Sequence, residues 1–253
     1  MKRLAIVPML LGAAALSAAD DARRSGFDFM SPATQAMQRD DMQNPGMLWV
    51  KDGETLWNAK VGVSDKSCAS CHRDATKTMH GVAARYPAFD ADERAPLTLA
   101  GRIATCRQKR QLALPLAAEG HDLLALEAYV AFQSRGLPIE PPDDPRLAPY
   151  RERGRLRYLE RVGQLDFSCA QCHDDNAGQR LAGSVIPQAH PTGYPLYRLE
   201  WQGLGSLQRR LRNCMSGVRA QPYAYGSMEL TELELYLASR AAGLRIETPA
   251  VRP

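Results

Sequence analysis

The stretches Cys68-Ala69-Ser70-Cys71-His72 and Cys169-Ala170-Gln171-Cys172-His173 decide the fold of this chain. Each has the pattern Cys-x-x-Cys-His, in which the two thiols attach to haem vinyl groups and the histidine becomes an axial iron ligand. A zinc site would need further ligands in recognisable pairs, and a redox dithiol would not repeat with a histidine each time. We therefore expect two covalently bound haem c groups. The attaching cysteines are Cys68, Cys71, Cys169 and Cys172, and the proximal iron ligands are His72 and His173.

The sequence around the two motifs is duplicated. Gly53-Glu54-Thr55-Leu56-Trp57 lies as far before the first motif as Gly154-Arg155-Leu156-Arg157-Tyr158 lies before the second. Further on, Gly136-Leu137-Pro138-Ile139-Glu140 recurs as Gly243-Leu244-Arg245-Ile246-Glu247. An early helix, a haem motif and a late helix in each half is the arrangement of class I cytochrome c. We expect a mainly α fold of two tandem class I cytochrome c domains with an N-terminal extension.

Local signals place the helices of each half. Asp52 caps a predicted helix that runs to about Lys60, and a second helix is predicted over residues 122–135, before Gly136. In the second half, Thr231-Glu232-Leu233-Glu234 has the pattern of a capping box. No strand pattern stands out.

The N-terminus has the features of a signal peptide. Positively charged residues precede an apolar run, from Leu4 to Leu16, that is too short to span a bilayer. Small residues follow the run, as a signal peptidase requires. The predicted organisation is a signal peptide (1–19), an extension (20–50), a first domain (51–142), a linker (143–153) and a second domain (154–253). We expect a periplasmic protein without a membrane span. The net charge of +4 is spread along the chain and gives no nucleic-acid signal.

Cys106 and Cys214 remain outside the motifs. In an oxidising compartment they could form a disulfide. However, each stands at the corresponding place of its repeat, four residues after Arg102 or Arg210, which favours a local role as the second axial ligand of each haem. Other candidates for this role do not recur between the halves, and they are His80, His121, His190, Met79, Met215 and Met228.

The surroundings of Cys214 indicate sulfur chemistry. Leu204, Leu207 and Leu211 recur at helical spacing, and a helix here places Arg210 one turn before Cys214 on the same face. A neighbouring guanidinium favours the thiolate and can also hold an oxyanion. Joining a thiol to a sulfur anion through a new S–S bond releases two electrons, which a haem can accept singly. The other nearby arginines, Arg209 and Arg212, are expected on a solvated helix face.

These residues together resemble the SoxA family, the dihaem subunits of periplasmic SoxAX cytochromes. The resemblance rests on the paired haem motifs, the spare cysteine of each half, and Arg210-Leu211-Arg212-Asn213-Cys214. It implies that Cys214 is catalytic and ligates the second haem iron, that Arg210 binds substrate, and that Cys106 ligates the first iron. It also implies a small monohaem SoxX-like partner, a SoxYZ-like sulfur carrier and thiosulfate as substrate.

The expected activity is that of an L-cysteine S-thiosulfotransferase, which transfers thiosulfate oxidatively to a carrier cysteine and passes electrons to c-type haem. Two alternatives stay open. One is a thiosulfate dehydrogenase that forms tetrathionate without a protein carrier. The other is a non-enzymatic dihaem electron carrier in which Cys106 and Cys214 form a disulfide.

Overall fold

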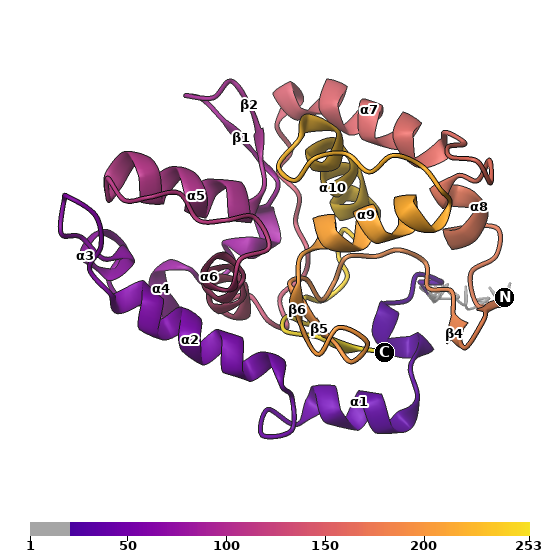
Figure 1. The fold of residues 1–253 in the computed structure, drawn as a ribbon, viewed down its shortest axis with the longest axis horizontal. Coiled ribbons are helices and arrows are strands. Elements are labelled where there is room, and N and C mark those ends of the chain that lie inside the picture. Colours follow the sequence, from indigo (N-terminus) through magenta and orange to yellow (C-terminus); the bar gives the residue numbers. More distant parts are fainter. Residues whose placement is uncertain (1–20) are drawn as a thin grey trace, which may run out of the picture.

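The computed structural model describes residues 21–253, and the expected signal peptide lies outside them. The chain forms two helical halves that lie side by side (Figure 1). The prediction of a mainly α fold is confirmed.

The helices and strands repeat in a similar order in the two halves. After α1 (Pro32–Arg39), the first half contains α2 (Gly46–Asn58), α3 (Cys68–His72), α4 (Ala75–Thr78), β1 (Ala88–Asp90), β2 (Ala95–Leu97), α5 (Leu99–Arg110) and α6 (His121–Phe132). The second contains α7 (Ala148–Leu159), α8 (Cys169–His173), β3 (Arg180–Leu181), β4 (Ser184–Val185), β5 (Leu196–Arg198), β6 (Gly203–Gly205), α9 (Leu207–Gly217), α10 (Met228–Arg240) and β7 (Val251–Arg252). Short 3-10 turns lie at Gly26–Phe29, Ala83–Arg85 and Pro145–Leu147.

The strands were not expected from the sequence. β1 pairs with β2 and β3 with β4 as antiparallel ribbons, while β5 pairs with β6 antiparallel and with β7 in parallel. Each strand has only two or three residues, which is too short to show an alternating pattern.

Two helix boundaries differ from the predictions. α2 begins at Gly46, so Asp52 lies inside it, because Gly46 packs against Pro249 and the helix continues onto the second half. α10 begins at Met228, where Ser227 accepts a hydrogen bond from the Leu230 N–H, so the predicted capping box lies within the helix. The segment predicted as a linker, 143–153, contains a 3-10 turn and the first part of α7.

Each half is built on a close helix crossing at a glycine. α2 packs along α6 and α7 along α10. A Cβ at Gly53 would lie 2.1 Å from the Ala125 carbonyl oxygen, and one at Gly154 would lie 2.0 Å from that of Glu232. Only glycine permits backbones to approach this closely. The duplicated glycines of the sequence therefore mark the same crossing in each half.

The halves are joined by the repeated segment itself. Its two copies run antiparallel to each other, with Pro138 opposite Arg245. Backbone hydrogen bonds link Gly136 N–H to the Ile246 carbonyl at 2.8 Å and Ile139 N–H to the Leu244 carbonyl at 2.8 Å. The two copies therefore form a pseudo-symmetric contact between the halves.

The N-terminal extension packs on the second half, although it precedes the first. Arg23 donates hydrogen bonds to the carbonyls of Arg240 and Ala242, at 3.1 and 2.8 Å. Asn44 donates to the Pro249 carbonyl at 2.8 Å, and α1 packs against β7. The extension therefore straps the C-terminal segment in place.

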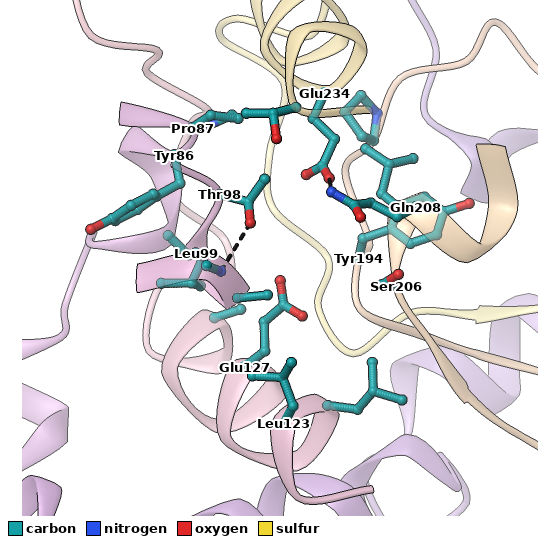
Figure 2. A pocket seen from close by; sticks show the side chains of 18 of the residues that line it. Tyr86, Pro87, Thr98, Leu99, Leu123, Glu127, Tyr194, Ser206, Gln208 and Glu234 are labelled. Atoms are coloured by element: carbon teal, nitrogen blue, oxygen red, sulfur yellow. Dashed lines mark hydrogen bonds between the residues drawn. The ribbon is translucent and has the colours of Figure 1, made fainter. Parts of the chain in front are cut away.

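A cavity of about 290 Å³ lies between the halves, lined from α5 and α6 on one side and from α9 and α10 on the other (Figure 2). Two of its lining groups are the carboxyls of Glu127 and Glu234. Burial and the charges of Glu234 and Glu119 raise the pKa of Glu127 to about 8. Burial also raises the pKa of Glu234 to about 7, although Gln208 donates a hydrogen bond to it at 2.7 Å. Glu127 Oε2 has no hydrogen-bond partner among the described residues.

Gly53→Ala and Gly154→Ala each force a methyl against a carbonyl oxygen, and we expect each to lower the free energy of unfolding by about 1–3 kcal/mol. Thermal unfolding of the haem-loaded protein measures this. Gly183→Ala is the matched control, because nothing lies within 4 Å of its Cβ position. A control that loses as much stability as the crossing variants would contradict the account.

A carboxyl whose pKa is raised in the folded protein binds its proton more tightly than in the unfolded chain, so stability is lost as pH rises from about 4.5 towards 8. Glu127→Gln mimics the protonated form. We expect its melting temperature at pH 8 to exceed that of the wild type by roughly 2–8 °C, with little difference at pH 4.5. The exposed Glu160→Gln should show no such pH-dependent gain, and a gain of equal size there would refute the assignment.

Candidate functional site

The haem motifs lie on two short helices, α3 and α8, that begin with side-chain caps. Ser67 Oγ accepts a hydrogen bond from Ser70 N–H at 3.0 Å, and Ser168 Oγ accepts one from Gln171 N–H at 3.2 Å. The residue at the third position returns a hydrogen bond to the cap, as in a capping box. These reciprocal bonds hold a single turn in helical form, so both thiols and the histidine have defined directions.

Gly62 and Gly163 bring the spare cysteines to the motifs. Both have positive φ, +68° and +73°. A Cβ at Gly62 would lie 2.1 Å from the Gln111 carbonyl oxygen, just after α5, and one at Gly163 would lie 2.1 Å from the Val218 carbonyl oxygen, just after α9. In the first half, Gln111 Nε2 also donates to the Lys66 carbonyl at 2.9 Å. The loop before each motif therefore docks against the C-terminal end of the helix that carries the spare cysteine.

Each spare cysteine lies beside the motif of its own half. Burial raises the pKa of Cys68, and the charge of Cys106 raises it further, so the two thiols lie within range of each other's charge. Burial and the charge of Cys214 likewise raise the pKa values of Cys169 and Cys172. The structure contains no disulfide between Cys106 and Cys214, so the disulfide alternative is wrong.

His173 is oriented as a metal ligand would be. Its Nδ1–H donates to the Pro187 carbonyl at 2.7 Å, so Nε2 is the free nitrogen, and the ring lies within hydrogen-bond reach of Cys214. Metal-ligating histidines commonly donate their other N–H to a carbonyl in this manner. His173 and Cys214 are therefore the residues that could ligate the iron of a haem attached at Cys169 and Cys172.

The first half has fewer contacts of this kind. His72 packs near Trp57, with ring centroids 5.7 Å apart, and Trp57 Nε1–H donates to the Arg73 carbonyl at 3.1 Å. Two of the competing ligand candidates are engaged elsewhere. His121 Nε2 lies 3.0 Å from Asp52 Oδ2, and His190 Nδ1–H donates to the Arg24 carbonyl at 2.7 Å.

Arg210 lies one turn before Cys214 on α9, as the spacing predicted. Among residues 21–253 it forms no ion pair with a carboxylate. Burial would lower its pKa, but the charges of Cys214, Tyr194 and Glu200 outweigh this effect and raise the pKa above its ordinary value. Leu204 lies in β6, so the helix is shorter than its leucine spacing indicated.

The thiol of Cys214 lies in a positive field. Burial alone would raise the pKa of Cys214. The hydrogen bond with His173 and the charges of Arg210 and Arg198 outweigh burial, so the pKa lies below its ordinary value.

The sequence reasoning did not single out Arg198 or Tyr194. Arg198 ends β5, and the signal that could have found it is the duplication, because it corresponds to Asp90 of β1. The expectation for Arg209 and Arg212 was only partly correct, because both guanidinium groups stack on aromatic rings, at 4.1 Å from the Trp201 centroid and 4.4 Å from that of Tyr225.

In the part of the chain that the structure describes, no helix combines the length and apolar character needed to cross a membrane.

Comparison with known proteins places the chain in one family. The model of the SoxA/TsdA cytochrome c domain matches it twice, over residues 52–139 and 153–246. The L-cysteine S-thiosulfotransferase subunit SoxA of Pseudaminobacter salicylatoxidans is 38% identical over 248 residues, which cover 97% of this chain and 87% of the relative. That of Rhodovulum sulfidophilum is 37% identical, with 92% and 81% covered.

A solved structure is similar throughout. The crystal structure of SoxXA from P. pantotrophus superimposes with a TM-score of 0.88 at 35% identity, covering 91% of this chain and 87% of that one. The two matches to the domain model confirm the expected pair of cytochrome c repeats. The chain belongs to the SoxA family of c-type cytochromes.

Proposed function

We propose that this protein is the catalytic subunit of an L-cysteine S-thiosulfotransferase, the activity that its relatives' names carry. The observation that carries the proposal is the pair Arg210 and Cys214, one helical turn apart, in which the arginine forms no ion pair with a carboxylate of residues 21–253. This arrangement offers a thiolate sulfur and a cation to the same small anion.

Two covalently bound haem c groups belong to the proposal. Cys68 and Cys71 would attach the first, with His72 and Cys106 as its iron ligands. Cys169 and Cys172 would attach the second haem, with His173 and Cys214 as its iron ligands. A haem attached beside Cys214 would supply an acceptor that takes electrons one at a time.

The reaction balances in two steps. In the first, the Cys214 thiolate and the outer sulfur of thiosulfate form an S–S bond, and two electrons are released to the acceptor. In the second, a carrier cysteine thiolate attacks that outer sulfur, and the Cys214 thiolate leaves. Arg210 holds the sulfonate oxygens through charge-assisted hydrogen bonds in both steps.

The partners follow from the same resemblance. The similar crystal structure is of a SoxXA complex, and we infer a small monohaem SoxX-like subunit here. A SoxYZ-like protein would present the carrier cysteine. Residues 1–19 would direct export, so the complex would work in the periplasm.

A matched pair of cysteine variants tests the assignment of Cys214. Cys214→Ala removes the sulfur that bonds to thiosulfate, and we expect carrier-dependent thiosulfate oxidation by the reconstituted, haem-loaded complex to fall at least about 100-fold. Cys106→Ala changes the corresponding residue of the other repeat and should retain most of the activity.

Equal activity of Cys214→Ala and wild type would overturn the proposal. Tetrathionate formed by the wild type from thiosulfate alone, without a carrier, would instead indicate a thiosulfate dehydrogenase.

Arg210 has its own test. Arg210→Gln removes a charge-assisted contact with the anion, and we expect kcat/KM for thiosulfate to fall by about 10- to 100-fold. Arg212→Gln is the control, because it removes the same charge from the same helix while its guanidinium stacks on Tyr225. If both variants lose kcat/KM equally, the effect belongs to the general charge of α9 and not to a contact.

A further inference from the structure

The pocket around Cys214 differs from its counterpart in the first half at one charged position. Thr98 caps α5 and Ser206 caps α9, and an antiparallel strand pair precedes each helix at the same distance. In this alignment of the two halves, Arg102 corresponds to Arg210 and Asp90 corresponds to Arg198. Both halves thus have an arginine at the helix position. The strand position is negatively charged in the first half and positively charged in the second.

In the first half the two groups neutralise each other. Asp90, whose side chain is 5% exposed, forms an ion pair with Arg102. Asp90 also accepts a hydrogen bond from the Glu93 N–H at 2.7 Å. The carboxylate therefore neutralises Arg102, the counterpart of Arg210.

In the second half the same positions carry two positive charges. The Arg198 side chain is 14% exposed, and burial and the charge of Arg210 both lower its pKa. Its carboxylate neighbour is Glu200, which is 65% exposed and whose Oε2 lies 3.2 Å from Arg198 Nε. Despite this proximity, the buried Nε has no hydrogen-bond partner among the described residues.

Glu200 offsets part of this positive charge, because it acts on Arg210 as well as on Arg198, but its carboxylate is largely exposed to solvent. Arg252, opposite Arg198 on β7, is paired with Glu247 at 2.6 Å. Tyr194 lies within the field of Arg198, Arg210 and Cys214. A half-buried pair of guanidinium groups is costly unless an anion joins them.

We propose that Arg198 is a second substrate-binding residue, which with Arg210 forms a two-arginine clamp for a dianion of the thiosulfate class at Cys214. This inference rests on the proposed function and deepens it. Two guanidinium groups match the two charges of thiosulfate, and their planar forks suit sulfonate oxygens. The clamp also explains why only one half is suited to the chemistry, because the first half has the carboxylate of Asp90 where the clamp has Arg198.

Direct binding tests the clamp. Isothermal titration of thiosulfate into the haem-loaded complex, without the carrier, gives Kd for the wild type, Arg198→Gln and Arg198→Asp. We expect Kd to rise about 10- to 100-fold for Arg198→Gln and further for Arg198→Asp, which places the Asp90–Arg102 arrangement in the second half. That arrangement already folds in the first half, so the variant should keep its haem spectrum and melting temperature.

Two further variants separate contact from general charge. Arg198→Lys keeps the charge without the fork and should recover part of the affinity. Arg212→Gln removes a charge outside the pocket and should leave Kd within about twofold of the wild type. An unchanged Kd for Arg198→Gln, no measurable binding by the wild type, or an equal loss in Arg212→Gln would each overturn the clamp. Turnover with the carrier tests the proposed function separately, since the clamp can bind thiosulfate whether or not transfer follows.

Discussion

Gly53 and Gly154 let α2 cross α6, and α7 cross α10, at the distance of direct backbone contact. The position of every cysteine depends on these crossings. Each early helix packs against the short haem-motif helix that follows it, and the later helix of the pair positions α5 or α9, which carries the spare cysteine. Positive-φ turns at Gly62 and Gly163 complete the frame by docking the loop before each motif against the end of that helix. The same glycine-dependent backbone contacts therefore form a site of cysteine and histidine residues in each half.

The two sites share a frame and differ in charge. Asp90 neutralises Arg102 in the first half, whereas Arg198 adds to Arg210 in the second. Retaining two half-buried arginines without a buried carboxylate partner opposes folding, and such groups concentrate where a protein binds ligands or performs chemistry. The pair of raised carboxyl pKa values in the cavity between the halves is another unfavourable feature, and it makes the contact between the halves sensitive to pH. The helix crossings and the contacts of the N-terminal extension therefore stabilise the molecule, whereas the Arg198–Arg210 pair and the Glu127–Glu234 pair destabilise it.

Much of this arrangement could be predicted from the sequence, because short motifs with fixed chemistry and a duplication carry the information. The haem motifs, the mainly α fold and the helical relation of Arg210 to Cys214 follow from spacing alone. The start of α2 could not, since it depends on contacts of Gly46 with the distant Pro249. The two- and three-residue strands are too short to leave a pattern. Arg198 was overlooked because its importance appears only when β5 is superimposed on β1, where its charge is opposite to that of Asp90.

We propose that the two halves have the same backbone arrangement and that only the second binds and transfers sulfur. Mass spectrometry of the haem-loaded protein under non-reducing conditions, after incubation with thiosulfate and followed by peptide mapping, tests it most directly. The account predicts two haems per chain and an added sulfur-containing mass confined to the peptide that holds Cys214, with the Cys106 peptide unmodified. Equal modification of both peptides, or a loss of two hydrogens that links Cys106 to Cys214, would contradict it.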